Sequence, residues 1–139
     1  HRIIQNPELM PVTEIMSETI ITSLPWRSPE RAIALIRQRK ITNLVIADED
    51  DKLLGIVSAY DLLKKLDDIK TVDEIMLPAE PFLLNTATAK DAIVMIDDAP
   101  FGMIPVVDKN HKVIGLVTRG SLLSAMSSQW TETEDDLVE

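Results

Sequence analysis

The sequence repeats itself at an interval of 60 residues without an insertion. The segment 55–63 (GIVSAYDLL) returns, altered, at 115–123 (GLVTRGSLL). A repeat of this length is a supersecondary unit that leaves an apolar face uncovered when alone, so the two halves are expected to pack on each other. The same interval relates these further pairs: Val12 and Val72, Glu14 and Glu74, Ile15 and Ile75, Met16 and Met76, Ala32 and Ala92, Ile33 and Ile93, Ile36 and Ile96, Asp48 and Asp108, Lys52 and Lys112.

Each unit has the pattern strand, helix, strand, strand, helix, which predicts an α/β (α+β) fold. In the first unit a short helical turn at 12–16 precedes a strand at 20–24, a helix ending near Arg39, a hairpin of 44–47 and 53–57, and a helix from Ala59 to about Leu66. The second unit predicts strands at 82–84, 104–107 and 113–117 and helices at 88–96 and 121–126. The domain prediction is a lead-in over 1–11, units over 12–66 and 72–126, a linker over 67–71 and an acidic tail over 127–139.

Ser58 and Asp61 stand where a buried strand runs directly into a helix. Free backbone N–H groups and the positive end of a helix dipole meet at such a junction, so it is a natural site for phosphate. An ordinary capping box explains the same two residues, and both interpretations can hold together.

Composition narrows the possible partners. The formal net charge is −9, but five acids without a base crowd residues 132–139, which leaves −4 for the rest. A mildly acidic body argues against nonspecific binding to nucleic acid or to an anionic membrane surface. The chain has no cysteine, no signal peptide and no apolar run of membrane-spanning length, which favours a reducing, intracellular context. It starts without methionine, so we expect a piece of a longer protein.

No constellation in the sequence predicts catalysis or a metal site. His1 and His111 have no partners at a useful spacing, and the acidic run 48–51 lacks the glycine and distal glutamate of an EF-hand loop. We interpret that run as the turn of a hairpin.

The doubled pattern resembles the CBS domain pair, or Bateman module, over nearly all of residues 12–123. The resemblance is carried by Glu14-Ile15-Met16, Pro105-Val106-Val107-Asp108 and Gly115-Leu116-Val117-Thr118 in the expected order. It implies tandem repeats packed with pseudo-two-fold symmetry, a homodimer, and a regulatory role in which adenine nucleotides bind in clefts between the halves.

Two segments, Arg2-Ile3-Ile4-Gln5 and 115–122, also look like the C-terminal region of the ATP-hydrolysing subunit of bacterial ABC importers for glycine betaine, carnitine and related osmoprotectants. That resemblance implies a non-enzymatic regulatory domain that binds cyclic di-AMP, in a full-length protein that is an ATPase. It also implies transporter membrane subunits as partners and a cytoplasmic location at the inner face of the membrane. The alternatives are an AMP- or ATP-sensing pair and a ligand-free module for dimerisation or ionic-strength sensing.

The resemblance implies that the Ser58 hydroxyl meets phosphate and the Asp61 carboxylate meets ribose. In the second unit Thr118 keeps the hydroxyl, but Ser121 replaces the aspartate, which puts ribose binding there in doubt. Arg119 favours an extra phosphate contact, because a guanidinium fork suits phosphate oxygens; a solvated surface arginine is the alternative.

Alternate residues of the strand that follows the first helix of each unit are expected to line the cleft. Ile41 and Asn43 correspond to Phe101 and Met103, and Leu116 joins them as a ligand-binding candidate. Such side chains can sandwich an adenine ring, although plain core packing explains any one of them equally well. Tyr60 either stacks near the phosphate or is simply exposed.

Charge differs between the first long helices of the two units. One carries Arg31, Arg37, Arg39 and Lys40, and its counterpart carries Asp91, Asp97 and Asp98. If two chains pair through these helices, opposite charges favour unit one against unit two of the partner. Two solvated faces are the alternative.

Overall fold

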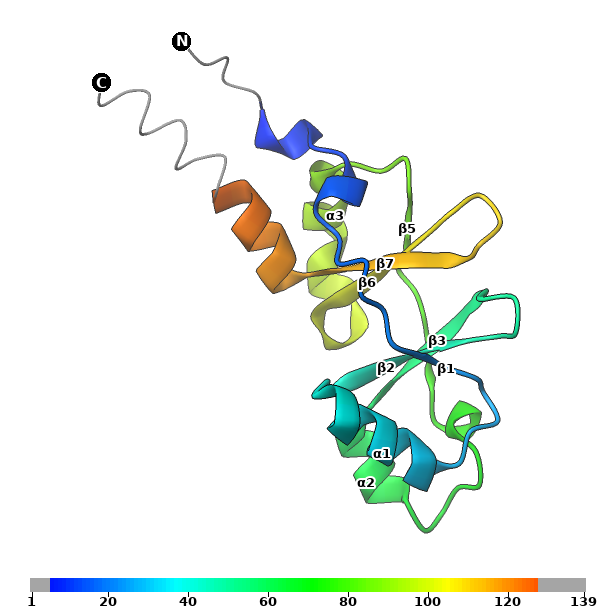
Figure 1. Ribbon diagram of the computed structural model, residues 1–139. Coiled ribbons are helices and arrows are strands. Elements are labelled where there is room, and N and C mark those ends of the chain that lie inside the picture. The colour runs from blue at the N-terminus through cyan, green and yellow to red at the C-terminus, as the bar shows by residue number, and fades with distance from the viewer. Residues whose placement is uncertain (1–5, 128–139) are drawn as a thin grey trace.

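The computed structural model describes residues 6–127 and contains two sheets, each with its own helices. Figure 1 shows the sheets meeting in the middle of the molecule and the helices at its two ends. The predicted order of elements is confirmed in both units. Unit 1 contains β1 (Thr22–Ser23), α1 (Pro29–Arg39), β2 (Asn43–Ala47), β3 (Leu53–Ser58) and α2 (Ala59–Lys65). Unit 2 contains β5 (Leu83–Leu84), α3 (Ala89–Met95), β6 (Met103–Val107), β7 (Val113–Thr118) and a helix over 119–127.

Short 3₁₀ helices join these elements: η1 (Pro7–Leu9), η2 (Val12–Glu14), η3 (Val72–Glu74), η4 (Ile96–Asp98) and η5 (Pro100–Gly102). The strand expected over 20–24 has only two residues, and the last helix begins at 119 rather than 121. The acidic tail and the segment Arg2 to Gln5 lie outside the described residues, apart from position 127.

Each sheet is completed by the segment that opens the other repeat. The first sheet has the order β1-β2-β3-β4, and β4 (Leu77–Pro78) comes from the start of the second repeat. In the second sheet the order is β5-β6-β7, and Ser17, at the start of the first repeat, bridges Leu116 of β7. β4 is not predictable from the sequence, because a two-residue strand has no alternation of apolar and polar residues.

The opening turns are exchanged in the same way in the core. Val12 and Ile15 are buried with Leu83, Ile104 and the other core residues of unit 2. Val72, at the equivalent position, is buried with the core of unit 1. Each repeat therefore supplies part of the other's hydrophobic core, which binds the two units into one fold.

A third apolar cluster lies between the sheets and is formed by Val45, Leu53, Ile56, Ala79 and Val107. At its edge Leu53 N donates to His111 O over 3.1 Å, and Val113 N donates to Asp51 O over 3.0 Å. These two hydrogen bonds exchange under the 60-residue equivalence. The predicted packing of the halves is thus confirmed, and their contact has pseudo-two-fold symmetry.

Polar side chains cap the first turns of the helices and close the hairpin turn, as the sequence predicts. Ser28 caps α1 by accepting from Arg31 N, and Thr88 with Asp91 forms the predicted capping box of α3. In the β2–β3 turn, Asp48 Oδ1 accepts from Asp50 N and Lys52 N, both over 2.9 Å. The run 48–51 is therefore the predicted hairpin turn.

Glu74 provides a prediction for the pH dependence of stability. Its carboxylate accepts hydrogen bonds from Thr71 N and Lys70 N, which hold the pKa of Glu74 below its ordinary value of 4.5. A lowered folded-state pKa stabilises the fold above the unfolded-state pKa and ceases to do so as the pH falls through the folded-state value. We expect Glu74→Gln to lose stability relative to wild type near pH 7, and this difference to shrink toward pH 3 in urea unfolding. An equal difference at both pH values would contradict this expectation.

Over residues 6–127 we find no helix that combines the length and apolar character needed to cross a membrane.

Candidate functional site

A cleft of about 280 Å³ lies between the two units. Its walls come from the segment before β1, the end of α1 with the start of β2, and the strands β6 and β7. The apolar lining residues are Ile21, Ile41, Val45, Met103 and Leu116, and the polar ones are Thr19, Lys40, Thr42, Asn43 and Thr118. The volume lies near the lower end of small-molecule sites, which start at about 300 Å³.

The structure brings five of the predicted site residues together in this cleft: Ile41, Asn43, Met103, Leu116 and Thr118. Met103 and Thr118 are register partners in the β6–β7 hairpin. The Thr118 hydroxyl accepts from Ser121 N over 3.0 Å, and the Ser121 hydroxyl accepts from Thr118 N over 2.9 Å. Both bonds of a capping box thus form at this junction of unit 2, and its threonine also faces the cleft.

Lys40 is the charged residue among those that line the cleft, and the sequence analysis did not select it for this role. It follows the last turn of α1 in the left-handed conformation, with φ 56°, and its N–H closes that turn on Arg37 O. This backbone brings the ammonium-bearing side chain to the start of β2. In the sequence, Lys40 stands at the expected end of a helix, where the second unit has Pro100. Left-handed caps are usually glycine, so a lysine at this position does not predict one.

Ser58, Tyr60 and Asp61 do not line this cleft. They occupy in unit 1 the places that Thr118, Gly120 and Ser121 occupy in unit 2. Ser58 is buried and accepts from Asp61 N over 3.0 Å. Within residues 6–127 the Asp61 carboxylate forms neither a reciprocal capping bond nor an ion pair. Only one of the two capping-box bonds is therefore present, and the carboxylate can contact solvent or a ligand. Tyr60 is 70% exposed and lies under the Lys64 ammonium, 5.1 Å from the ring centroid.

Arg119 also lies outside the cleft lining, on the outer surface of unit 2. Its Nη1 lies 3.3 Å from Asp97 Oδ1, and both side chains are more than half exposed. The guanidinium passes so close to Gly102 that a Cβ there would lie 3.3 Å from Arg119 Nε. An exposed pair of this kind contributes little to stability, so Arg119 can exchange Asp97 for another anion at small cost.

In the part of the chain that the structure describes, no group of three or more histidine, cysteine, aspartate or glutamate side chains is placed to hold a metal ion.

Comparison with known proteins agrees with this architecture. The family model for the CBS domain matches twice, over residues 12–68 and 72–128. The chloroplastic CBS domain-containing protein CBSX2 of Arabidopsis thaliana is 28% identical over 144 residues, which cover 80% of this chain and 60% of that protein. The carnitine transport ATP-binding protein OpuCA of Listeria monocytogenes is 25% identical over 130 residues, which cover 93% of this chain and 33% of that protein. The chain therefore spans less than two thirds of each of these relatives.

Solved structures match as well. The crystal structure of CBSX2 in complex with AMP has a TM-score of 0.73 at 28% identity and covers 86% of this chain and 97% of that one. The structure of Staphylococcus aureus OpuCA has a TM-score of 0.74 at 20% identity and covers 83% of this chain and 97% of that one. Two family matches, together with the exchanged sheets and the cleft between the units, lead to one assignment: the chain belongs to the CBS domain family and is a pair of CBS domains.

Proposed function

We propose that this chain is the regulatory module of the ATP-hydrolysing subunit of an osmoprotectant ABC importer, and that it binds cyclic di-AMP at a cleft completed by a second copy. The observation that carries the proposal is the cleft between the units. Its apolar walls suit an adenine ring, and the Thr118 hydroxyl and the Lys40 ammonium suit phosphate. The chain itself carries out no reaction in this proposal.

The size of the cleft favours a ligand shared between two chains. About 280 Å³ suits one base with its sugar better than a whole cyclic dinucleotide. A two-fold symmetric ligand can place one half in each of two clefts when the chains pair about a two-fold axis. Arg119, paired with Asp97 on the surface of unit 2, is then available to a phosphate held by the partner chain.

Charge and apolar surface support the pairing of two chains. α1 presents Arg37 and Arg39, whereas η4 presents Asp97 and Asp98. Four large apolar side chains are more than half exposed on the neighbouring helices: Tyr60, Leu63, Val94 and Leu123. Opposite charges at the two ends favour unit 1 of one chain against unit 2 of the other, with the apolar side chains buried between them. A crosslink between the α1 helices of two chains would contradict this arrangement.

The resemblance to OpuCA suggests the place of the module in the cell. An alignment over 93% of the chain extends over both repeats. The membrane subunits of the importer would be reached through an ATPase domain, which places the module at the inner face of the membrane. Ligand binding would control uptake only through the difference in its affinity for the two states of the transporter.

Calorimetric titration with cyclic di-AMP tests the proposal. We expect one ligand per two chains with micromolar or tighter affinity, and a loss of roughly tenfold in Lys40→Gln and in Arg119→Ala, because each variant removes a charged donor to phosphate. Lys90→Gln removes the same charge from the surface of α3 and is expected to bind as wild type does.

The same titration with AMP and ATP separates the alternatives. Binding of AMP or ATP in place of the cyclic dinucleotide, weakened by Asp61→Ala more than by Arg119→Ala, would favour a mononucleotide sensor of the kind suggested by the AMP complex of CBSX2. Silence from all three ligands would favour the module for dimerisation or ionic-strength sensing, whose association would follow salt concentration.

A further inference from the structure

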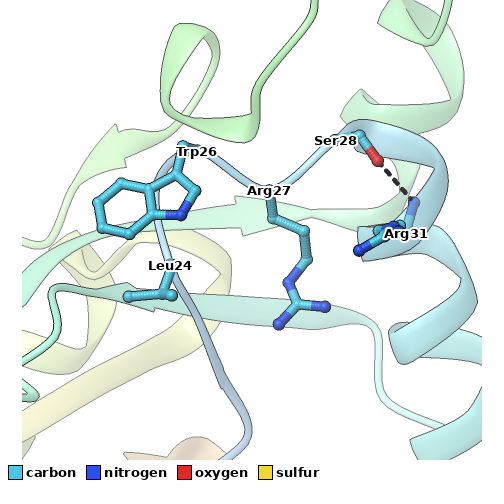
Figure 2. A pocket seen from close by; sticks show the side chains of 5 residues that line it. All are labelled: Leu24, Trp26, Arg27, Ser28 and Arg31. Carbon is cyan, nitrogen blue, oxygen red and sulfur yellow. Dashed lines mark hydrogen bonds between the residues drawn. The ribbon is translucent and has the colours of Figure 1, made fainter.

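A second hollow, of about 380 Å³, lies in unit 1 at the loop between β1 and α1. It is lined by Leu24, Trp26, Arg27, Ser28 and Arg31, and none of these residues lines the cleft between the units. Figure 2 shows the indole of Trp26 above Leu24, with Arg27 between Trp26 and Arg31. The indole is 54% exposed although it is the largest side chain of the loop. The hollow therefore combines a flat ring surface with two guanidinium groups.

The Arg27 guanidinium is held in place by a hydrogen bond to a buried serine. Arg27 Nε donates to Ser23 Oγ over 2.8 Å, and Ser23 is 3% exposed. This bond occupies one of the five guanidinium donors, so the others remain available to a ligand. A buried hydroxyl that fixes an arginine at the rim of a hollow reduces the entropy that this side chain loses on binding.

Backbone bonds make the loop itself rigid. Val72 N donates to Arg27 O over 2.9 Å, and Asp73 N donates to Pro25 O over 3.0 Å. The Ser28 hydroxyl caps α1 by accepting from Arg31 N, which fixes the first turn that carries Arg31 (Figure 2). Trp26, Arg27 and Arg31 therefore project from a backbone that is fixed before any ligand binds.

The duplication provides an internal comparison, because unit 2 keeps the frame but lacks the aromatic and cationic side chains. Thr88 caps its helix, and Val12 N donates to Ala87 O over 2.9 Å, as Val72 N does to Arg27 O. At the equivalent positions unit 2 has Leu83 for Ser23, Thr86 for Trp26, Ala87 for Arg27 and Asp91 for Arg31. The lead-in also crosses the same place in unit 2, where Met10 O accepts from Ala89 N over 2.8 Å. In unit 1 the position of Ala89 is taken by Pro29, which has no N–H to offer. The hollow is therefore a feature of unit 1, and its charged residues are not needed by the fold.

We propose that this hollow binds a small molecule in which a phosphate monoester is carried on a flat ring. The ring stacks on the Trp26 indole, and the phosphate accepts from the Arg27 and Arg31 guanidinium groups. Phosphate suits the pair because two guanidinium forks match a doubly charged anion with several oxygens. Within residues 6–127 no carboxylate lies within 4.0 Å of either guanidinium, so the two cations are not neutralised by an ion pair. The site is separate from the nucleotide cleft proposed above.

Fluorescence of Trp26 tests the proposal directly. The chain has two tryptophans, so Trp130→Phe leaves Trp26 as the sole reporter. With phenyl phosphate as the probe we expect a saturable change in its emission. Inorganic phosphate and phenol should each bind at least roughly tenfold more weakly, because each supplies only one of the two contacts. Equal binding of phenyl phosphate and either fragment, or no saturable change, would overturn the proposal.

Variants in the same background locate the site. Arg31→Gln is expected to weaken phenyl phosphate binding roughly tenfold, since it removes a charged donor whose side chain supports no other described contact. Lys90→Gln removes one positive charge from the first turn of α3 and should leave the affinity within twofold, as roughly expected for a screened charge on the far unit. Equal affinities for the two variants would show that only overall charge matters and would also overturn the proposal.

Discussion

Gly55→Ala is expected to lower the free energy of unfolding by about 3 kcal/mol, because an added methyl group meets backbone that cannot move aside. A Cβ at Gly55 would lie 2.7 Å from Leu77 O and 2.9 Å from Met76 Sδ. Leu77 belongs to β4, which pairs with β3 at this point, so relief of the clash requires separation of the strands. Urea unfolding of both proteins measures the difference.

The equivalent glycine should tolerate the change better. A Cβ at Gly115 would clash with the Met16 side chain, but a methionine side chain can adopt another rotamer. We therefore expect a loss of about 1–2 kcal/mol for Gly115→Ala, part of which Met16→Ala restores.

Gly120→Ala is the matched control for these two variants. Its added Cβ would have the Thr118 hydroxyl as its nearest neighbour, at 3.7 Å, which is ordinary contact, and the residue lies in the last helix. Alanine is favoured over glycine in helices, so stability should be unchanged or slightly raised. A loss at Gly120 as large as that at Gly55 would show that the close approach of the opening segments is not the cause.

These glycines show which features of the fold can be predicted from the sequence and which cannot. Gly55 and Gly115 follow the 60-residue interval, as do Met16 and Met76, and both pairs mark the duplication in the sequence. The packing of each methionine on the glycine of the other unit is not visible in the sequence. Contact between residues far apart in the chain leaves no periodicity, whereas helices, hairpins and caps depend on neighbouring residues and were predicted from them.

The same limit explains what was found and missed in the cleft. Ile41, Asn43 and Met103 were predicted from strand alternation, which is a local pattern. Lys40 reaches the cleft because it ends α1 in the left-handed conformation although it is not glycine. A lysine gives no sign of this conformation in the sequence. Arg119 was selected for its charge and its place after a strand. Whether it meets phosphate depends on a partner chain, so its role stays a prediction.

A duplication also fixes the period of the repeat without fixing where one packing unit ends. The repeats predicted at 12–66 and 72–126 and the family matches at 12–68 and 72–128 both begin with an opening turn. In the structure that turn packs in the opposite unit, so Val12 lies in the core of unit 2 and Val72 in the core of unit 1. Sequence similarity cannot reveal this exchange. The sequence repeats every 60 residues whether each opening turn packs in its own unit or in the other one.

The exchange predicts where each of two matched mutations acts. Val12→Ala removes two methyl groups from a fully buried side chain and should cost about 2–3 kcal/mol through lost burial and the cavity left behind. Because its neighbours are in unit 2, amide hydrogen exchange should speed up in β6 and β7 rather than in the adjacent α1. Val72→Ala, the same change at the equivalent buried position, should speed exchange in β2 and β3 of unit 1. Hydrogen exchange followed by mass spectrometry resolves these segments. Faster exchange in β2 for Val12→Ala, or in β6 for Val72→Ala, would mean that each repeat buries its own opening turn and that the exchanged architecture is incorrect.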